Sequence, residues 1–235
     1  DACVVENVLL SGAGTQQNPY LIGSALDFTA VSKANVEKGV NFSLFSNIIV
    51  EATRSEQSAF VFNGYLNGNG KTITLENSNC GAIYKIGEDG SVYNVGIAGK
   101  ISTSSYDSVG ALADYNAGKI EKIRSTANVE NTAGTVGAKG IELTLNNSQE
   151  NEGKRGIAGG IVGTNLENAE VYNCTVSSSS SSTGTVKASI AGGVIVGLNY
   201  GKIEMCVGNG CFGAWNAKET GKSLSNYSYG GAIVG

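Results

Sequence analysis

Short apolar stretches recur along the whole chain and are separated by Gly, Asn and Ser. This pattern predicts many short β-strands joined by tight turns. A helical pattern is expected at one place, residues 30–39 (AVSKANVEKG), where a short helix can form. We therefore expect an all-β fold with one short helix in its N-terminal part.

Two short motifs alternate along the chain and define an internal repeat. The first is a glycine followed by small or apolar residues and a polar turn. It begins at Gly81, Gly110, Gly159, Gly193 and Gly231. The second is a further apolar stretch, such as KIEMC at 202–206, and it follows each of the first four copies. Units this small cannot bury an apolar face alone, so they are expected to stack. The longer gap between the second and third glycines corresponds to two repeats or to one repeat with an insertion.

Stacked repeats place equivalent side chains in columns that are spaced about 4.8 Å apart. Two columns carry only apolar residues and cysteine, which predicts that both face the interior. Their members are Val92, Ile120, Val171 and Ile203 in the first, and Val95, Ile123, Cys174 and Cys206 in the second. A third column holds Asn116, Asn165 and Asn199. We expect these amides to form a hydrogen-bonded ladder in left-handed turns.

These columns together predict the architecture and the domain organisation. We expect a right-handed parallel β-helix of about seven to nine turns. Residues 1–50 are expected to form an N-terminal cap with the first strands, because an unpaired strand edge needs cover. Residues 51–235 are expected to form one continuous set of repeats. Two stretches, 141–156 and Ser177–Ser182, are polar and are expected to leave the stack as loops.

The repeats resemble the GLUG-motif family, whose glycine-rich consensus has the form GGIVG-x-N-x-G-x-I-x-N-C. Three segments carry the resemblance: GGIVGTN with VYNC at 159–165 and 171–174, GVIVGLNYGKIEMC at 193–206, and the weaker GALADYNAGKIEKI at 110–123. Residues 12–31 look like the segment that opens such domains, and 62–75 like the strand–turn–strand that follows it. The resemblance implies a parallel β-helix in a bacterial surface or secreted protein, often an adhesin. It supplies no catalytic residues.

Composition and charge exclude several classes of protein. Thirty-four glycines, one proline and 41% apolar residues fit neither collagen nor a disordered chain. Sixteen basic and twenty acidic residues give a net charge of −4 without a basic stripe, which disfavours a nucleic-acid partner. No long apolar run predicts membrane insertion within this segment. The start DACVVENVLL lacks a basic n-region and a long apolar h-region, so the segment is expected to be a mature protein whose export signal, if any, has been removed. An extracellular or cell-surface location is expected because the resemblance to the GLUG-motif family implies it.

The residue types that usually carry chemistry are scarce. Histidine is absent, which removes the usual general base and the commonest metal ligand. No cofactor or metal is therefore expected. Asp107, Asp114 and Glu121 are the nearest candidates for the paired acids of a polysaccharide-acting enzyme, but we expect them to be solvated surface charges. The segment 67–72 (NGNGKT) lacks the glycine spacing of a phosphate loop and is expected to be a tight turn.

Aromatic residues offer candidates for partner contact. Tyr93 and Tyr172 share one repeat position beside inward residues, so both should point outward. An exposed aromatic row can stack on sugar rings or anchor a protein, although ordinary cross-strand packing is the alternative. Further candidates in loops or turns are Tyr106, Tyr115, Tyr200 and Trp215.

Five cysteines leave several pairings open, and an odd count leaves at least one thiol unpaired. Cys174 and Cys206 either form a disulfide between stacked repeats or remain buried free thiols. Cys211 could pair instead with Cys206 across a small loop. A bond between Cys3 and Cys80 would hold the N-terminal cap in place.

The sequence as a whole predicts a non-catalytic, adhesin-like extracellular module that binds a glycan or a protein on another cell surface. A second hypothesis is a self-assembling fibre or surface-layer subunit joined through exposed strand edges, since the sequence stops at the opening of another repeat, YGGAIVG at 229–235. A third hypothesis, a polysaccharide-acting enzyme, is disfavoured by the scattered acids.

Overall fold

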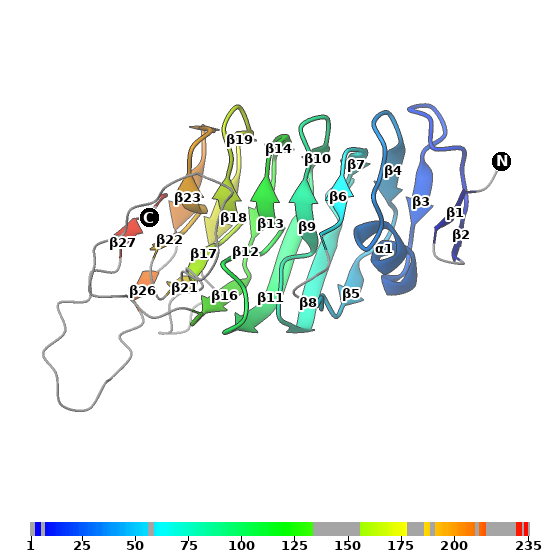
Figure 1. The fold of residues 1–235 in the computed structure, drawn as a ribbon. Coiled ribbons are helices and arrows are strands. Elements are labelled where there is room, and N and C mark those ends of the chain that lie inside the picture. The colour runs from blue at the N-terminus through cyan, green and yellow to red at the C-terminus, as the bar shows by residue number, and fades with distance from the viewer. Residues whose placement is uncertain are drawn as a thin grey trace, which may run out of the picture.

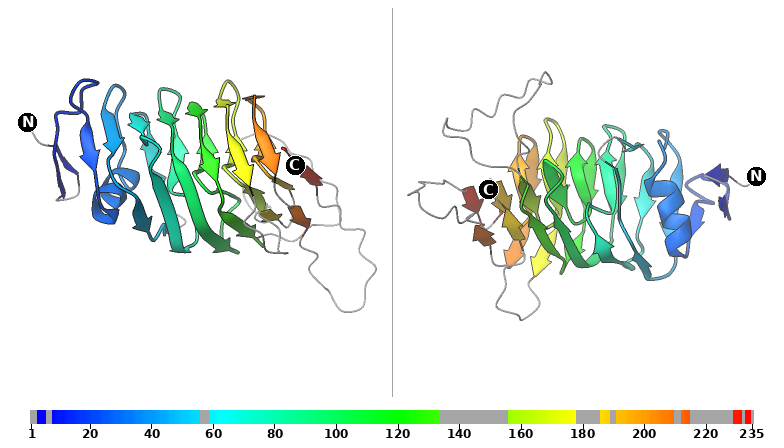
Figure 2. Two further views of the ribbon diagram at one scale, coloured as in Figure 1. Left: turned by 180° about the vertical axis from the view of Figure 1, so that it is seen from behind. Right: turned by 60° about the horizontal axis from the view of Figure 1, so that its bottom comes forward.

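The structure is a computed structural model that describes residues 3–5, 8–55, 59–133, 156–177, 186–188, 191–209, 212–214, 229–231 and 233–234. The described part is almost entirely β, with the single helix α1 (Ala25–Ser32). Strands lie side by side in an elongated stack from the N-terminal to the C-terminal end (Figure 1). Figure 2 shows the same stack from behind and from below, with α1 on one flank near the N-terminal end. The all-β expectation is confirmed.

Parallel pairing between repeats builds four sheets along the stack. One is a seven-stranded sheet, whose strands along the stack are β3 (Tyr20–Ile22), β4 (Asn41–Leu44), β7 (Tyr65–Asn67), β10 (Ser91–Tyr93), β14 (Lys119–Glu121), β19 (Glu170–Tyr172) and β24 (Lys202–Glu204). The five-stranded sheet contains β6 (Val61–Phe62), β9 (Ile83–Ile86), β13 (Ala113–Asn116), β18 (Val162–Asn165) and β23 (Val196–Asn199).

The other two sheets complete each repeat. The four-stranded sheet contains β12 (Ser108–Gly110), β17 (Ile157–Gly159), β22 (Ala191–Gly193) and β27 (Tyr229–Gly231). The nine-stranded sheet contains β5 (Ile48–Val50), β8 (Thr72–Ser78), β11 (Gly96–Thr103), β15 (Arg124–Ser125), β16 (Asn128–Asn131), β20 (Thr175–Ser177), β21 (Val186–Ala188), β25 (Val207–Asn209) and β26 (Phe212–Ala214). From β13 onward the chain visits the five-, seven-, nine- and four-stranded sheets in that order, repeatedly. This order makes the stack parallel and β-helix-like.

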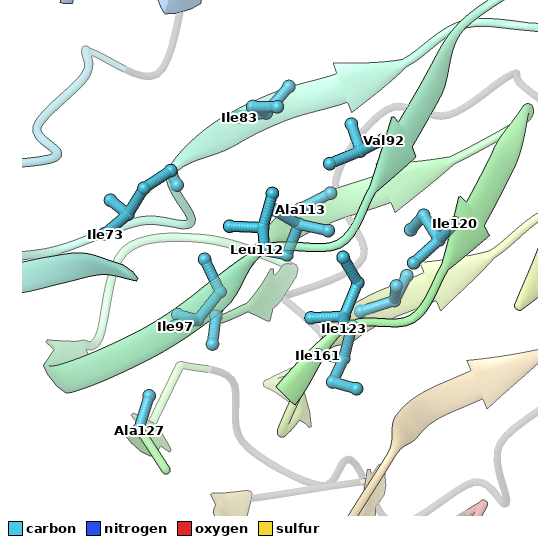
Figure 3. Close-up of a cluster of buried hydrophobic side chains, with 14 of the residues drawn as sticks. Ile73, Ile83, Val92, Ile97, Leu112, Ala113, Ile120, Ile123, Ala127 and Ile161 are labelled. Atoms are coloured by element: carbon cyan, nitrogen blue, oxygen red, sulfur yellow. The ribbon is translucent and has the colours of Figure 1, made fainter. Parts of the chain in front are cut away.

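Both predicted apolar columns face the interior. Val92 pairs in register with Ile120, Ile120 with Val171, and Val171 with Ile203. Side chains from different sheets converge on one interior (Figure 3), and most of the buried apolar residues form one continuous cluster. Because the columns continue from repeat to repeat, burial of apolar side chains holds the stack together along its length.

The long gap between glycines contains one repeat and an insertion. Gly110 pairs directly with Gly159, so no further repeat lies between them. Most of the predicted loop 141–156, and all but the first residue of Ser177–Ser182, lie outside the described residues.

The predicted asparagine ladder is present. Asn116 Nδ2 donates to Asn165 Oδ1 at 2.8 Å, and Asn165 Nδ2 donates to Asn199 Oδ1 at 2.8 Å. Asn116 and Asn165 are fully buried, so the ladder satisfies amides that water does not reach. The expected left-handed geometry is wrong for these residues. It occurs instead at the corner after the seven-stranded sheet, at Asn94, Lys122, Asn173 and Met205.

Two elements lie near the N-terminal end of the stack. Strands β1 (Cys3–Val5) and β2 (Val8–Leu10) pair antiparallel, and Leu10 is buried in the core. Helix α1 begins earlier than the predicted 30–39 because Ser24 and Asp27 form a capping box. The segment 30–39 contains only the last turn of α1, and Gly39 lies in a left-handed turn with φ +83°.

The turn at 67–72 joins strands of different sheets. Strand β7 lies in the seven-stranded sheet and β8 in the nine-stranded sheet, so the two do not form a hairpin. Asn69 and Gly70 have positive φ values of 50° and 71° and let the chain change direction there. The tight turn is confirmed, as a corner between two sheets.

Candidate functional site

Backbone atoms of the four- and five-stranded sheets meet directly along what we call the glycine seam, formed by Gly110, Gly159, Gly163 and Gly197. A Cβ atom on Gly159 would lie 2.7 Å from the amide nitrogen of Gly197 and would collide with the carbonyl oxygen of Val162. A Cβ atom on Gly163 would lie 2.7 Å from the amide nitrogen of Val109. The glycines of the repeat are therefore required for close contact between two sheets.

Asp114 occupies a position in β13 where the following repeats have glycine. The pairs Ala113–Val162 and Tyr115–Thr164 place Asp114 opposite Gly163 in the register. Its carboxylate is fully buried, and Oδ1 accepts hydrogen bonds from the amides of Gly81 at 2.9 Å and Gly110 at 3.2 Å. The side chain thus satisfies backbone donors at the end of the glycine seam.

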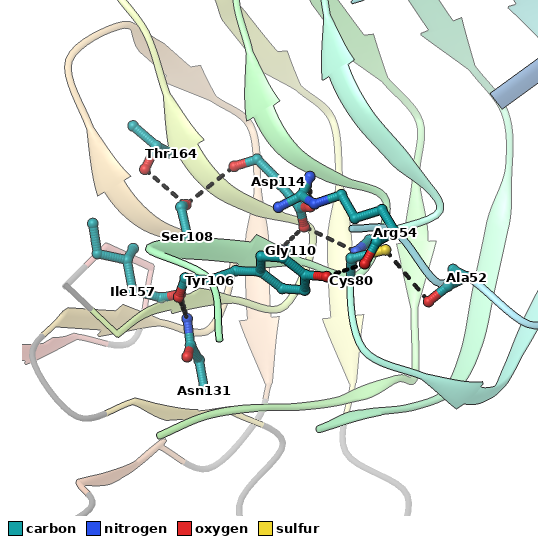
Figure 4. Close-up of polar contacts among 11 residues, drawn as sticks. Ala52, Arg54, Cys80, Tyr106, Ser108, Gly110, Asp114, Asn131, Ile157 and Thr164 are labelled. Atoms are coloured by element: carbon teal, nitrogen blue, oxygen red, sulfur yellow. Dashed lines mark hydrogen bonds and ion pairs between the residues drawn. The ribbon is translucent and has the colours of Figure 1, made fainter. Parts of the chain in front are cut away.

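Arg54 supplies the opposite charge. Its Nη1 lies 2.6 Å from Asp114 Oδ2, and its side chain is only 9% exposed. The guanidinium carbon lies 4.2 Å from the ring centre of Tyr84 and 4.4 Å from that of Tyr106. Figure 4 shows Arg54 beside Asp114 and Tyr106. The Tyr106 hydroxyl donates to the carbonyl oxygen of Arg54. Arg54 is therefore held by an ion pair and by two aromatic rings.

Burial governs the ionisation of this cluster. It raises the pKa of Asp114 to about 6, although Arg54 and the amides of Gly81 and Gly110 oppose the shift. Burial also raises the pKa of the Cys80 thiol to about 12. The adjacent cavity, lined in part by Phe28 and Phe60, has a volume of about 30 Å³. This volume admits water but not a sugar ring.

The arrangement around Asp114 indicates a structural role. Both carboxylate oxygens are engaged by protein groups, and none of the side chain is exposed. The expectation of a solvated charge at Asp114 is wrong, because this residue neutralises Arg54 and accepts from two amides. The expectation that Tyr106 is exposed is also wrong, since it is 6% exposed and covers Arg54.

The outer face of the seven-stranded sheet carries the other candidate residues. Alternate residues of each strand point inward, and the outward positions form two columns. The first column holds Tyr65, Ser91, Lys119, Glu170 and Lys202, and the second holds Asn67, Tyr93, Glu121, Tyr172 and Glu204. We call these residues, with Lys122 and Met205 at the adjacent corner, the outer face.

Tyr93 and Tyr172 point outward, as predicted, and both are half-buried. They are not neighbours, because Glu121 pairs with each of them and separates them by one repeat. Lys122 Nζ donates to the Tyr93 hydroxyl at 3.2 Å and lies 5.0 Å from its ring centre. The Tyr172 hydroxyl donates to Met205 Sδ at 3.1 Å. Each tyrosine is thus held by the corner residue of the next repeat.

Charges on the outer face balance. Three ion pairs join a lysine and a glutamate: Lys119–Glu170 at 3.5 Å, Lys122–Glu121 at 3.8 Å and Lys202–Glu204 at 3.0 Å. These pairs are exposed and contribute little to stability. Because the charges cancel, the surface around Tyr93 and Tyr172 is polar but has no net charge.

The remaining candidate aromatic residues lie elsewhere. Tyr115 packs edge-on against Tyr84 with ring centres 5.5 Å apart, and burial raises its pKa. Tyr200 is half-buried against the small apolar cluster of Ile157, Ala191 and Leu198. Trp215 lies outside the described residues. The candidates therefore do not converge on one surface.

Cys80, Cys174 and Cys206 are free thiols. Cys174 and Cys206 are neighbours in one column, as predicted, and a hydrogen bond from the Cys174 thiol lowers the pKa of Cys206 to about 7. The same contact, and after it burial, raises the pKa of Cys174. Because Cys80 and Cys206 are free, the alternatives that pair Cys80 with Cys3 and Cys206 with Cys211 are wrong for this structure. Cys211 and the side chain of Cys3 themselves lie outside the described residues.

Comparisons with known proteins give partial matches. No family model matches this chain. The chain is 27% identical over 150 residues to halomucin of Haloquadratum walsbyi, a match that covers 54% of this chain and 2% of halomucin. It is 31% identical over 134 residues to a protein of Evansella cellulosilytica named as a Gly-rich membrane protein, covering 50% of this chain and 15% of that protein. The chain thus matches a small part of each relative.

One solved structure aligns along most of the chain. It comes from Bacteroides ovatus, is named as an immunoglobulin A1 protease, and covers 95% of this chain and 85% of its own. The TM-score is 0.47 and the identity is 15%, which is too low to support a conclusion. In the part of the chain that the structure describes, no helix is long and apolar enough to cross a membrane.

Proposed function

We propose that this chain is a right-handed parallel β-helix module of the GLUG-repeat type, with about seven to nine turns, and that it acts outside the cell as a non-catalytic, adhesin-like binding module. The outer face carries the proposal. There, Tyr93 and Tyr172 lie on one sheet, where the Tyr93 hydroxyl accepts a hydrogen bond from Lys122 and the Tyr172 hydroxyl donates one to Met205. Aromatic side chains that are fixed on a rigid scaffold are well suited to stack on a partner.

The placement of the acids supports a non-catalytic role. Asp114 is buried at the glycine seam, whereas Glu121 lies on the outer face. They do not share a surface on which a glycosidic bond could lie between them. Among the described residues, Arg54–Asp114 is the one ion pair with both side chains buried, and it is enclosed by protein.

A cell-binding experiment tests the proposal. The purified chain, labelled with a fluorophore, is incubated with bacterial and animal cells, and bound fluorescence is measured by flow cytometry. We expect saturable binding that Tyr93→Ala with Tyr172→Ala lowers at least tenfold. Ile49→Ala is the control, because Ile49 is 58% exposed and lies on β5 of the nine-stranded sheet, away from the outer face. Equal loss in the control, or no saturable binding, would contradict the proposal.

A second candidate is self-assembly through strand edges at the C-terminal end. Met205, Val207 and Ile233 are 70%, 57% and 40% exposed there. Exposed apolar residues beside a strand edge that no other described strand pairs with favour pairing with another copy. Light scattering across concentration measures this directly: growth of mass with concentration supports assembly, and a constant monomer mass excludes it.

A further inference from the structure

From β10 to β24, the outer face has a period of two repeats rather than one. The four segments that end the seven-stranded sheet read SVYN (91–94), KIEK (119–122), EVYN (170–173) and KIEM (202–205). Tyr-Asn therefore alternates with Glu followed by Lys or Met, while the inward residue of every segment stays aliphatic. The interior repeats with every turn of the chain, and the outer surface repeats with every second turn.

Contacts between neighbouring repeats explain this alternation. The corner residues Asn94, Lys122, Asn173 and Met205 all have left-handed backbones, with φ between 51° and 55°. Asparagine tolerates this geometry well, and longer side chains tolerate it less well. Lys122 and Met205 occur where the preceding repeat has a tyrosine, and each contacts that hydroxyl. The less favourable corner residues are thus the ones that position Tyr93 and Tyr172.

The spacing of the two tyrosines is defined by the stack. Neighbouring strands lie about 4.8 Å apart, so positions two repeats apart are separated by roughly 10 Å. Tyr93, Glu121 and Tyr172 then form a line of aromatic ring, carboxylate and aromatic ring along the stack. A linear ligand that fits this line presents the same face at every second unit.

An extended β-1,4-linked chain of pyranose sugars has this property, because each ring is flipped relative to the last. Alternate rings can stack on Tyr93 and Tyr172, while the ring between them offers hydroxyl groups to Glu121. The balanced charges of the outer face favour a neutral glycan over an anionic one, which would need unpaired cations.

We propose that the outer face binds a neutral, extended β-1,4-linked polysaccharide lying along the stack, with alternate sugar rings on Tyr93 and Tyr172. This inference rests on the proposed binding function and specifies its ligand. Lys122 and Met205 act as positioning residues that hold the two rings, and Glu121 contributes hydrogen bonds between them.

Binding of soluble gluco-oligosaccharides by calorimetry tests this ligand class. The β-1,4-linked hexasaccharide should bind, and the α-1,4-linked hexasaccharide of the same sugar should not. Affinity should rise steeply between the disaccharide and the tetrasaccharide, once both tyrosines are covered. Tyr93→Ala and Tyr172→Ala should each weaken binding roughly three- to tenfold. Ile49→Ala, on the nine-stranded sheet, should leave it unchanged.

Lys122→Asn separates positioning from folding. Asparagine suits the left-handed corner, so the thermal midpoint should not fall, while affinity for the hexasaccharide should fall. Equal affinity for both linkages, or no gain with length, would overturn the ligand assignment. If cells are bound through the tyrosines but the β-1,4-linked glycan does not compete, the ligand assignment fails and the binding function stands. Absence of cell binding would instead remove the proposed function.

Discussion

The glycine seam and the outer face are built by the same repeat but use their residues in opposite ways. In the seam, backbone meets backbone, and a single added methyl group at Gly159 or Gly163 has no room. On the outer face, side chains project from a sheet whose interior column is already complete. Changes in the seam should therefore alter stability, and changes on the outer face should alter binding.

Asp114 shows how the seam accommodates an exception. It lies opposite Gly163, at a position where the later repeats have glycine. Its carboxylate accepts hydrogen bonds from two backbone amides and forms an ion pair with Arg54. A charge is tolerated at this position because every one of its partners is supplied. The outer face needs no such compensation, since its charged residues remain in contact with water.

The largest loss of stability is expected in the glycine seam. Gly159→Ala should lower the free energy of unfolding by about 3 kcal/mol or more, because the methyl group meets backbone atoms that cannot move independently. Urea denaturation measures this change. Gly39→Ala is the control, since its added Cβ meets nothing within 4 Å and only its φ of +83° is unfavourable, a cost of about 1 kcal/mol. Equal costs at the two positions would contradict the close packing of the seam.

The second largest loss of stability is expected at the buried ion pair of Arg54 and Asp114. Arg54→Met should lower the free energy of unfolding at neutral pH by about 3 kcal/mol, because it leaves Asp114 buried without its counter-charge. Adding Asp114→Asn to Arg54→Met should recover part of the loss. A double variant that is less stable than Arg54→Met alone would show that the charge of Asp114 is satisfied without Arg54.

The same carboxyl predicts a pH dependence. Its pKa is raised to about 6 in the folded protein, above the value near 4 of an unfolded chain. The folded state therefore holds a proton that the unfolded state has lost. Stability from this group is complete below about pH 4 and is lost as the pH rises through about 6. Thermal unfolding across this range should show a downward trend with pH that Asp114→Asn reduces. If Asp114→Asn left the pH trend unchanged, a titratable group other than Asp114 would be responsible for it.

The asparagine ladder should have an intermediate effect. Asn165→Ala removes hydrogen bonds to both neighbours and leaves buried amide groups unpaired, so a loss of about 2 kcal/mol is expected. Asn199→Ala breaks one of these bonds at a half-buried position and should cost about 1 kcal/mol. Urea denaturation of both variants compares them, and a reversed order would contradict the cooperative ladder.

The smallest effect on stability is expected on the outer face. Tyr93→Ala should change the free energy of unfolding by no more than about 0.5 kcal/mol, since the side chain is outside the core. Urea denaturation in parallel with the binding measurements is the check. A loss comparable to that of Asn165→Ala would mean that the tyrosine supports the fold rather than a partner.

The sequence pattern predicts the interior better than the sites. Apolar columns and the asparagine ladder follow from repetition, because residues at one repeat position must share one environment. The pair of Arg54 and Asp114 does not follow from repetition, since each occurs once. Its one signal in the sequence is a charged residue at a position where Gly163 and Gly197 stand in the later copies. Helix α1 begins at Ala25 rather than at residue 30 because Ser24 and Asp27 form a local capping box.

The two-repeat alternation also bears on how such a chain can grow by duplication. Gain or loss of a single repeat would keep the apolar columns and the asparagine ladder in step, so the fold would survive. It would also bring two tyrosine-bearing turns, or two glutamate-bearing turns, next to each other and shift the surface out of phase. Only duplication of two repeats together preserves both the interior columns and the alternating outer surface. Two repeats are therefore the smallest unit that can be duplicated without changing this surface.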